Sequence, residues 1–197
     1  LPLAVIECKS PYVSNPMATG IDQLLRYTNS RTPLSNEGSE RLFWYNQILV
    51  STYGDQARLG TVSSLAEHYL EWKDPYPLTV EEVRSAPLGQ KVGDPLDTHY
   101  LLLLREARRK RISGGTGGTR PLGHSAAISS QSILLAGVFR KENLLDLIRS
   151  FIVFDTVDGK TIKKIARYQQ YRAVHKAIQR LKTPGNRRDR GGVVWHT

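Results

Sequence analysis

The sequence has little cysteine and methionine, one residue of each, and it has no long apolar segment. A single cysteine, Cys8, excludes an internal disulfide and a zinc site built from several cysteines, and it is typical of a reducing compartment such as the cytoplasm. No apolar run approaches the roughly 20 residues of a membrane-spanning helix, and the first residues carry no signal-peptide pattern. The five histidines lack metal-ligand spacing. We therefore expect a cytoplasmic protein with no membrane segment.

Positive charge is abundant and unevenly distributed. The 197 residues are 40% hydrophobic and 23% charged, as in globular proteins, with a formal net charge of +10. Residues Lys160 to Arg190 contain eleven Lys or Arg against Asp189 alone. Such groups suit a nucleic-acid backbone, although they also occur as solvated helix faces. A second group of cations, a candidate DNA-binding set, closes a helix expected from Asp97: Arg105, Arg108, Arg109, Lys110 and Arg111.

The most informative segment is the apolar run from Leu3 that ends in Glu7-Cys8-Lys9. In a β-strand, alternate side chains point to the same face, so Glu7 and Lys9 share one face and Cys8 points the other way. Hydrolysis of a phosphodiester at neutral pH needs a hard metal ion such as Mg²⁺ and a cation that holds or deprotonates the attacking water. Glu7 suits the metal and Lys9 suits the water. The backbone carbonyl of Cys8 is a candidate further metal ligand.

A second motif follows on a helix expected to begin near Pro16. Gln23 and Tyr27 are four residues apart, so their side chains lie on one helix face and can reach back to the strand. Each motif alone has a structural explanation, since Glu-x-Lys is common as a solvated pair on an edge strand and Gln-x-x-x-Tyr as a polar stripe on a surface helix. The order of strand, Glu-x-Lys, loop and helix is more specific, because it places all four side chains at one location.

These motifs resemble the PD-(D/E)xK nuclease superfamily, in which an Asp on one strand precedes Glu-x-Lys on the next. Glu7 and Lys9 match the second half, and Gln23-x-x-x-Tyr27 is similar to an additional motif of one branch. The Asp has no counterpart in this sequence, so we expect a second acidic ligand upstream of Leu1. The resemblance implies that Gln23 and Tyr27 support the site or contact the phosphate backbone.

The rest of the chain gives a coarser outline. Residues 42–53 and 57–62, separated by Gly54-Asp55, predict a β-hairpin, and residues 75–95 are expected to be mostly loop. Residues 113–123 have a linker composition and lack the Gly-Lys-Ser/Thr ending and flanking elements of a phosphate-binding loop. Asn143 is expected to cap a helix that leads into a strand at residues 151–154.

The last forty residues predict a different module, with a helix that carries Val174, Ile178 and Leu181 on one side and a strand at residues 192–195. It is either a basic amphipathic helix packed on the preceding domain or, by resemblance, the entry to the first RecA-like domain of superfamily 2 helicases. A Gln amide can pair with two groups on the adenine edge. By that resemblance Gln170 is the adenine-reading residue, and the sequence contains no phosphate-binding loop after it.

Taken together, the motifs resemble the restriction (R) subunit of type I restriction enzymes. The resemblance implies an α/β fold: a truncated restriction-endonuclease-like core, with a mixed sheet flanked by helices, over residues 1–155, and the first elements of a RecA-like domain over residues 156–197. Residues 108–131 are expected to be an insertion. The implied activity is Mg²⁺-dependent cleavage of double-stranded DNA coupled to ATP-driven translocation, with methyltransferase (M) and specificity (S) subunits as partners. We expect this piece to be inactive alone.

Two alternatives stay open at this stage. The chain is either a nuclease region or a non-catalytic module that binds DNA or docks a subunit, with a vestigial nuclease motif. Binding by such a module is indifferent to Mg²⁺ and to Glu7. An RNA-processing nuclease has the same Glu7 and Lys9 chemistry, and only the family resemblance favours DNA.

Overall fold

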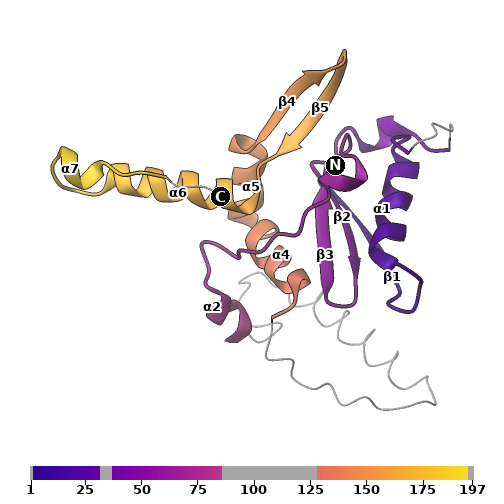
Figure 1. Ribbon diagram of the computed structural model, residues 1–197, viewed down its shortest axis with the longest axis horizontal. Coiled ribbons are helices and arrows are strands. Elements are labelled where there is room, and N and C mark those ends of the chain that lie inside the picture. Colours follow the sequence, from indigo (N-terminus) through magenta and orange to yellow (C-terminus); the bar gives the residue numbers. More distant parts are fainter. Residues whose placement is uncertain (1, 32–36, 86–127, 195–197) are drawn as a thin grey trace.

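The computed structural model describes residues 2–31, 37–85 and 128–194, and Figure 1 shows their arrangement. The candidate DNA-binding cations Arg105 to Arg111, the expected linker and most of the expected insertion lie outside these ranges. The elements follow this order: β1 (Ala4–Lys9), α1 (Pro16–Tyr27), η1 (Glu40–Phe43), β2 (Ile48–Tyr53), β3 (Gln56–Gly60), η2 (Ala66–His68), α2 (Val80–Ser85), α4 (Ser130–Val138), α5 (Lys141–Ser150), β4 (Ile152–Val157), β5 (Lys160–Ile165), α6 (Tyr168–Lys182) and α7 (Arg187–Arg190). The fold is α/β, as expected.

A mixed three-stranded sheet forms the first half, in the order β1-β2-β3. β1 and β2 are parallel, and β2 and β3 form an antiparallel hairpin. The hairpin turns at Gly54-Asp55, where Gly54 has φ 49°, a left-handed conformation that glycine adopts without steric cost. The hairpin prediction is thereby confirmed.

Each face of the sheet is covered by helices. α1 lies on one face, where Ile21, Leu24 and Leu25 pack with Leu49 and Tyr69. α4 and α5 lie on the other, with Leu134, Val138 and Leu147 packed against alternate residues of β2 and β3. The period of two along β2 explains the division: Leu49 faces α1, whereas Ile48 and Val50 face the second core. The side chains of β1 and β2 that point to the α1 face are therefore the ones that can contact residues of α1.

The β4–β5 hairpin projects from this body (Figure 1) and is fixed to it through Lys163. The main-chain carbonyl of Lys163 accepts a hydrogen bond from the Thr61 hydroxyl at 2.6 Å, and its N–H donates to the Ser63 hydroxyl at 2.6 Å. Its ammonium group donates to the carbonyl of Asn46 at 2.9 Å, and burial lowers the pKa of this lysine. The hairpin is thus joined to segments about one hundred residues earlier in the chain.

An aromatic cluster attaches the first turns of α6. The Tyr171 side chain is 3% exposed and its ring lies 4.8 Å from that of Phe151 and 6.0 Å from that of Trp72, between centroids. The remainder of α6 extends away from the body (Figure 1). Val174, Ile178 and Leu181 are on the helix, as predicted, and all three are exposed.

Two local predictions are wrong, and a third segment differs in detail. Asn143 is not a helix cap, because α5 begins at Lys141 and Arg140 holds the cap position; the Asn143 amide instead donates to the carbonyls of Tyr76 and Gly137. Residues 75–95, expected to be mostly loop, contain the short helix α2, whose start is stabilised by Glu82 accepting from the Thr79 N–H; residues 86–95 lie outside the described ranges. Residues 192–194 form no strand, since no described strand lies beside them to pair with.

Candidate active site

The four residues of the two predicted motifs come together between β1 and α1. The alternation along β1 turns Glu7 and Lys9 toward α1, as predicted, and leaves Ile6 and Cys8 exposed on the other face. α1 begins at Pro16, which suits the first helical position because its nitrogen needs no hydrogen-bond partner there. Both elements therefore confirm the sequence prediction.

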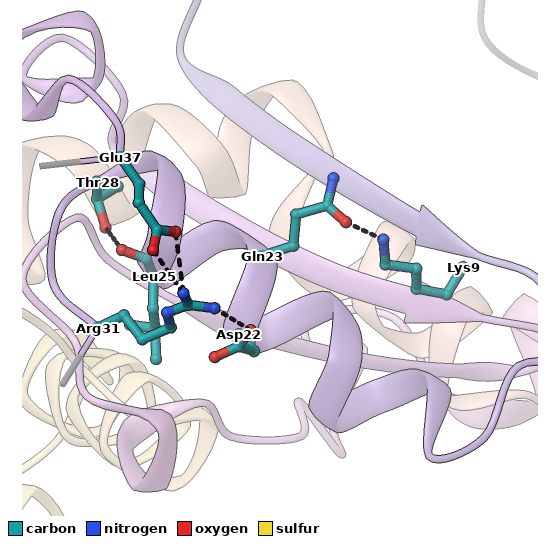
Figure 2. Close-up of polar contacts among 7 residues, drawn as sticks. All are labelled: Lys9, Asp22, Gln23, Leu25, Thr28, Arg31 and Glu37. Atoms are coloured by element: carbon teal, nitrogen blue, oxygen red, sulfur yellow. Dashed lines mark hydrogen bonds and ion pairs between the residues drawn. The ribbon is translucent and has the colours of Figure 1, made fainter. Parts of the chain in front are cut away.

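The side chains form a continuous polar chain. Nζ of Lys9 lies 2.9 Å from Oε1 of Glu7, and the two side chains are 15% and 17% exposed. The same ammonium group donates to Oε1 of Gln23, and Nε2 of Gln23 donates to the hydroxyl of Tyr27. Figure 2 shows the Lys9–Gln23 contact across the strand and the helix. A charged pair of low exposure is thus held by a neutral amide whose own orientation is fixed by a phenol.

Two residues that the sequence analysis did not single out shape this arrangement. A Cβ atom at Gly20 would overlap the Ser51 hydroxyl and lie 3.4 Å from Cγ of Lys9, so glycine lets α1 approach the sheet this closely without displacing Ser51. The ring of Phe43 stacks on that of Tyr27, with centroids 6.5 Å apart and an interplanar angle of 14°. Gly20 lies one helical turn before Gln23, so its position relative to that motif could have been recognised in the sequence. No sequence pattern pointed to Phe43.

The donor set for a metal ion is small but of the right chemistry. Leu3 accepts a hydrogen bond from the N–H of Ile48 on β2, and the alternation along the strand then turns the carbonyl of Cys8 to the opposite edge of β1. No strand within the described ranges pairs with that edge. The Glu7 carboxylate and this carbonyl are hard oxygen ligands that suit Mg²⁺. Within the same ranges, no three or more His, Cys, Asp or Glu side chains are grouped so that they could hold a metal ion.

A separate ion-pair network lies on the other side of α1. Arg31 binds Asp22 at 3.1 Å and Glu37 at 2.7 Å, and Figure 2 shows it fixing the segment after the helix. Among the hydrogen bonds and ion pairs of the described residues, none joins this network to Glu7 or Lys9. Its role is to fasten the end of α1.

Gln170, the predicted adenine-reading residue, lies far along the chain from this site. It occupies the first turn of α6, and its Oε1 accepts the N–H of Arg167 at 2.9 Å, so the side chain caps the helix. The residue is exposed. The structure places Gln170 within α6, with its carbonyl oxygen engaged in the cap.

Comparisons with known proteins bear on these observations. Residues 1–68 match the family described as type I restriction enzyme R protein N terminus. All of the chain aligns with the type I restriction enzyme HindI endonuclease subunit of Haemophilus influenzae, at 34% identity over 203 residues, which is 14% of that protein. It also aligns over its full length, at 26% identity, with 16% of a Methanocaldococcus jannaschii protein provisionally named as the endonuclease subunit of type I restriction enzyme MjaIXP.

The chain therefore spans about a seventh of the length of these relatives. Its similarity to the N-terminal region of type I restriction R proteins supports the predicted restriction-system nuclease family. No solved structure matches the chain significantly. In the described part of the chain, no helix has the length and apolar character needed to cross a bilayer.

Proposed function

We propose that this chain carries the nuclease centre of a type I restriction endonuclease subunit and that the centre hydrolyses phosphodiester bonds of double-stranded DNA. The contact between Lys9 and Gln23 carries the proposal, because it joins two sequence motifs that have no structural need of one another. A surface ion pair on an edge strand needs no partly buried amide partner. The similarity of residues 1–68 to type I restriction R proteins supports the same conclusion.

Each side chain has a distinct task in this proposal. Glu7 and the Cys8 carbonyl would hold Mg²⁺, which supplies an acidified water and neutralises charge that develops on the phosphate. Lys9 has one N–H left beyond its contacts with Glu7 and Gln23, and it donates this N–H to the attacking water. Gln23 accepts from the Lys9 ammonium and sets its direction, and Tyr27 fixes the rotation of the Gln23 amide. Low exposure of Glu7 and Lys9 strengthens these interactions, since water screens them less.

The complete protein would couple cleavage to ATP-driven movement of DNA and would assemble with methyltransferase and specificity subunits. The length of the two relatives leaves room for a motor domain. Gln170 would contact adenine there; its Oε1 caps α6, and its amide nitrogen has no hydrogen-bond partner in the described part of the chain. Contact with both groups of the adenine edge requires that this cap open.

The test uses the complete restriction subunit in its assembled complex. Lys9→Ala is expected to abolish DNA cleavage and to leave ATP hydrolysis unchanged, because it removes only the cation of the nuclease centre. Lys73→Ala is a matched control, since Lys73 also pairs with a glutamate two residues before it, Glu71, at 3.9 Å, but is 61% exposed. Normal cleavage by the Lys9 variant would refute the assignment.

A second candidate is a DNA-binding or subunit-docking module without catalysis. The exposed cations of α6 and α7 favour it, including Lys176, Arg180 and Arg187. Metal dependence separates the two functions. If the chain is a docking module, DNA binding should be equal with and without Mg²⁺, and Glu7→Gln should affect no activity of the complex. If it is a nuclease, DNA cleavage should be lost both on removal of Mg²⁺ and in the Glu7→Gln variant.

A further inference from the structure

A hollow of about 470 Å³ lies beside the first turns of α1, over the β2–β3 hairpin. Met17 and Ile21 form an apolar wall. Tyr53 and Arg58 line it from the sheet, and Asp22 lies at its edge. The hollow contains none of the four predicted nuclease residues, so its relation to them depends on the register of the sheet.

The register places the hollow on the same face of the sheet as the nuclease centre. Ser51 faces α1, because its hydroxyl donates to the carbonyl of Met17. Its partners in the neighbouring strands are Glu7 on β1 and Arg58 on β3, so these three side chains form one row across the sheet. Lys9 and Tyr53 are partners in the next row. Glu7 and Lys9 lie on one flank of α1, and Arg58 lies on the other.

The polar groups of the hollow are available for a ligand. In the part of the chain that the structure describes, the guanidinium of Arg58 has no carboxylate partner and the Tyr53 hydroxyl has no hydrogen bond. The single carboxylate of the lining, Asp22, is already paired with Arg31 at 3.1 Å. The first turn of α1 contains no acidic residue. The hollow therefore presents one cation without a carboxylate partner, Arg58, together with a neutral donor, and its one carboxylate, Asp22, is ion-paired with Arg31.

We propose that this hollow is a phosphate subsite that holds the DNA backbone next to the bond cleaved at Glu7 and Lys9. The guanidinium of Arg58 offers a planar pair of donors that matches two phosphate oxygens, and the Tyr53 hydroxyl adds a third donor. β1 and β3 are two strand spacings apart, about 10 Å. A phosphate at Arg58 therefore lies no more than about three nucleotides from the bond at Glu7 and Lys9, since each nucleotide advances a B-form strand by about 3.4 Å along the helix axis and the strand also winds around that axis. Arg58 and Tyr53 are thus positioning residues for the substrate, and the inference rests on the proposed nuclease function.

Binding of a short fluorescent DNA duplex, measured by anisotropy over a range of salt concentrations without divalent metal, tests this subsite. Arg58→Ala is expected to weaken binding severalfold and to reduce the steepness of log K against log salt by about 0.9, the change for one lost phosphate contact. Arg58→Lys should keep the salt dependence and lose part of the affinity. Tyr53→Phe should weaken binding by about threefold, with no change in salt dependence, because it removes a neutral donor.

The matched control is Arg149→Ala on α5, which removes an exposed arginine remote from the hollow. Unchanged binding by Arg58→Ala, or equal losses in the Arg58 and Arg149 variants, would overturn the subsite. Because Arg58 is exposed, its variant should fold, and thermal unfolding of each variant checks this. Failure of the nuclease proposal has a different signature, namely normal cleavage by Lys9→Ala, whatever the Arg58 variants do to binding.

Discussion

Lys9 on β1 and Gln23 on α1 are joined by a hydrogen bond between side chains fourteen residues apart. An ammonium group so held cannot turn freely into solvent, and its remaining donors keep a fixed direction. The same ammonium lies 2.9 Å from Glu7, so one amide positions both charges of the pair. The close contact of α1 with the sheet is what makes this geometry possible.

Gly20→Ala tests the close contact. Its new methyl group would overlap the Ser51 hydroxyl, so either this hydroxyl turns away and loses its bond to the Met17 carbonyl, or α1 shifts away from β2 and takes Gln23 away from Lys9. We expect a loss of about 1–3 kcal/mol in the free energy of unfolding, as for other overpacked sites, together with loss of cleavage in the complete subunit. Gly192→Ala, where a Cβ meets nothing within 4 Å, should change neither. Full activity of the Gly20 variant would show that the contact is dispensable.

Tyr27→Phe tests the orientation of Gln23. It keeps the ring that stacks on Phe43 and removes only the hydroxyl that accepts from the Gln23 amide. We expect the cleavage rate to fall about tenfold, the effect of roughly 1.4 kcal/mol, with little change in stability. The control is Tyr45→Phe, which alters a 58% exposed tyrosine near the same end of the sheet. Equal rates in the two variants would contradict this role of Tyr27.

Glu7→Gln tests the metal site in the chain itself. Mn²⁺, which accepts the same hard oxygen ligands as Mg²⁺, should broaden the backbone amide signals of residues 7–9 at low metal concentration. The effect should disappear in Glu7→Gln, because an amide oxygen carries no charge. Glu71→Gln should leave it intact, since that carboxylate belongs to the exposed pair with Lys73. Undiminished broadening in the Glu7 variant would exclude this carboxylate as a ligand.

The sequence was sufficient to predict the local elements of the site. The alternation in β1 and the position of Pro16 before a helix predicted that Glu7, Lys9, Gln23 and Tyr27 share one location, and the structure confirms that location. Their catalytic roles stay predictions. Such features are readable because strand period, helix period and helix start signals depend on neighbouring residues only.

The features that were not predicted depend on contacts between distant segments. Phe43 stacks on Tyr27 from a segment sixteen residues away, and Arg58 shares a row with Glu7 only because β2 lies between their strands. Neither spacing has a local signature. The strand predicted at residues 192–195 is absent from residues 192–194, the part of it that the structure describes. The reason is related: a strand needs a partner as well as β-branched residues, and no described strand supplies one.

The final prediction concerns the attachment of α6 through Tyr171. Burial, followed by the nearby charge of Asp146, raises the pKa of Tyr171 from 10.0 to about 12. In the unfolded chain this phenol loses its proton near pH 10, whereas the folded chain retains it to about pH 12. The folded state then binds more protons between these values, so the free energy of unfolding should fall as the pH rises from 10 to 12.

Tyr171→Phe removes this titration and keeps most of the ring contacts with Phe151 and Trp72. Urea unfolding at several pH values should therefore show a smaller loss of stability between pH 10 and 12 in the variant than in the parent protein. Part of the loss should remain, because burial also raises the pKa of Tyr69. Tyr12→Phe, at a 96% exposed site, should match the parent. If the Tyr171→Phe variant and the parent protein lose stability equally between pH 10 and 12, the Tyr171 phenol of the parent is as accessible to hydroxide in the folded state as in the unfolded state. The attachment of α6 through this buried ring would then be refuted.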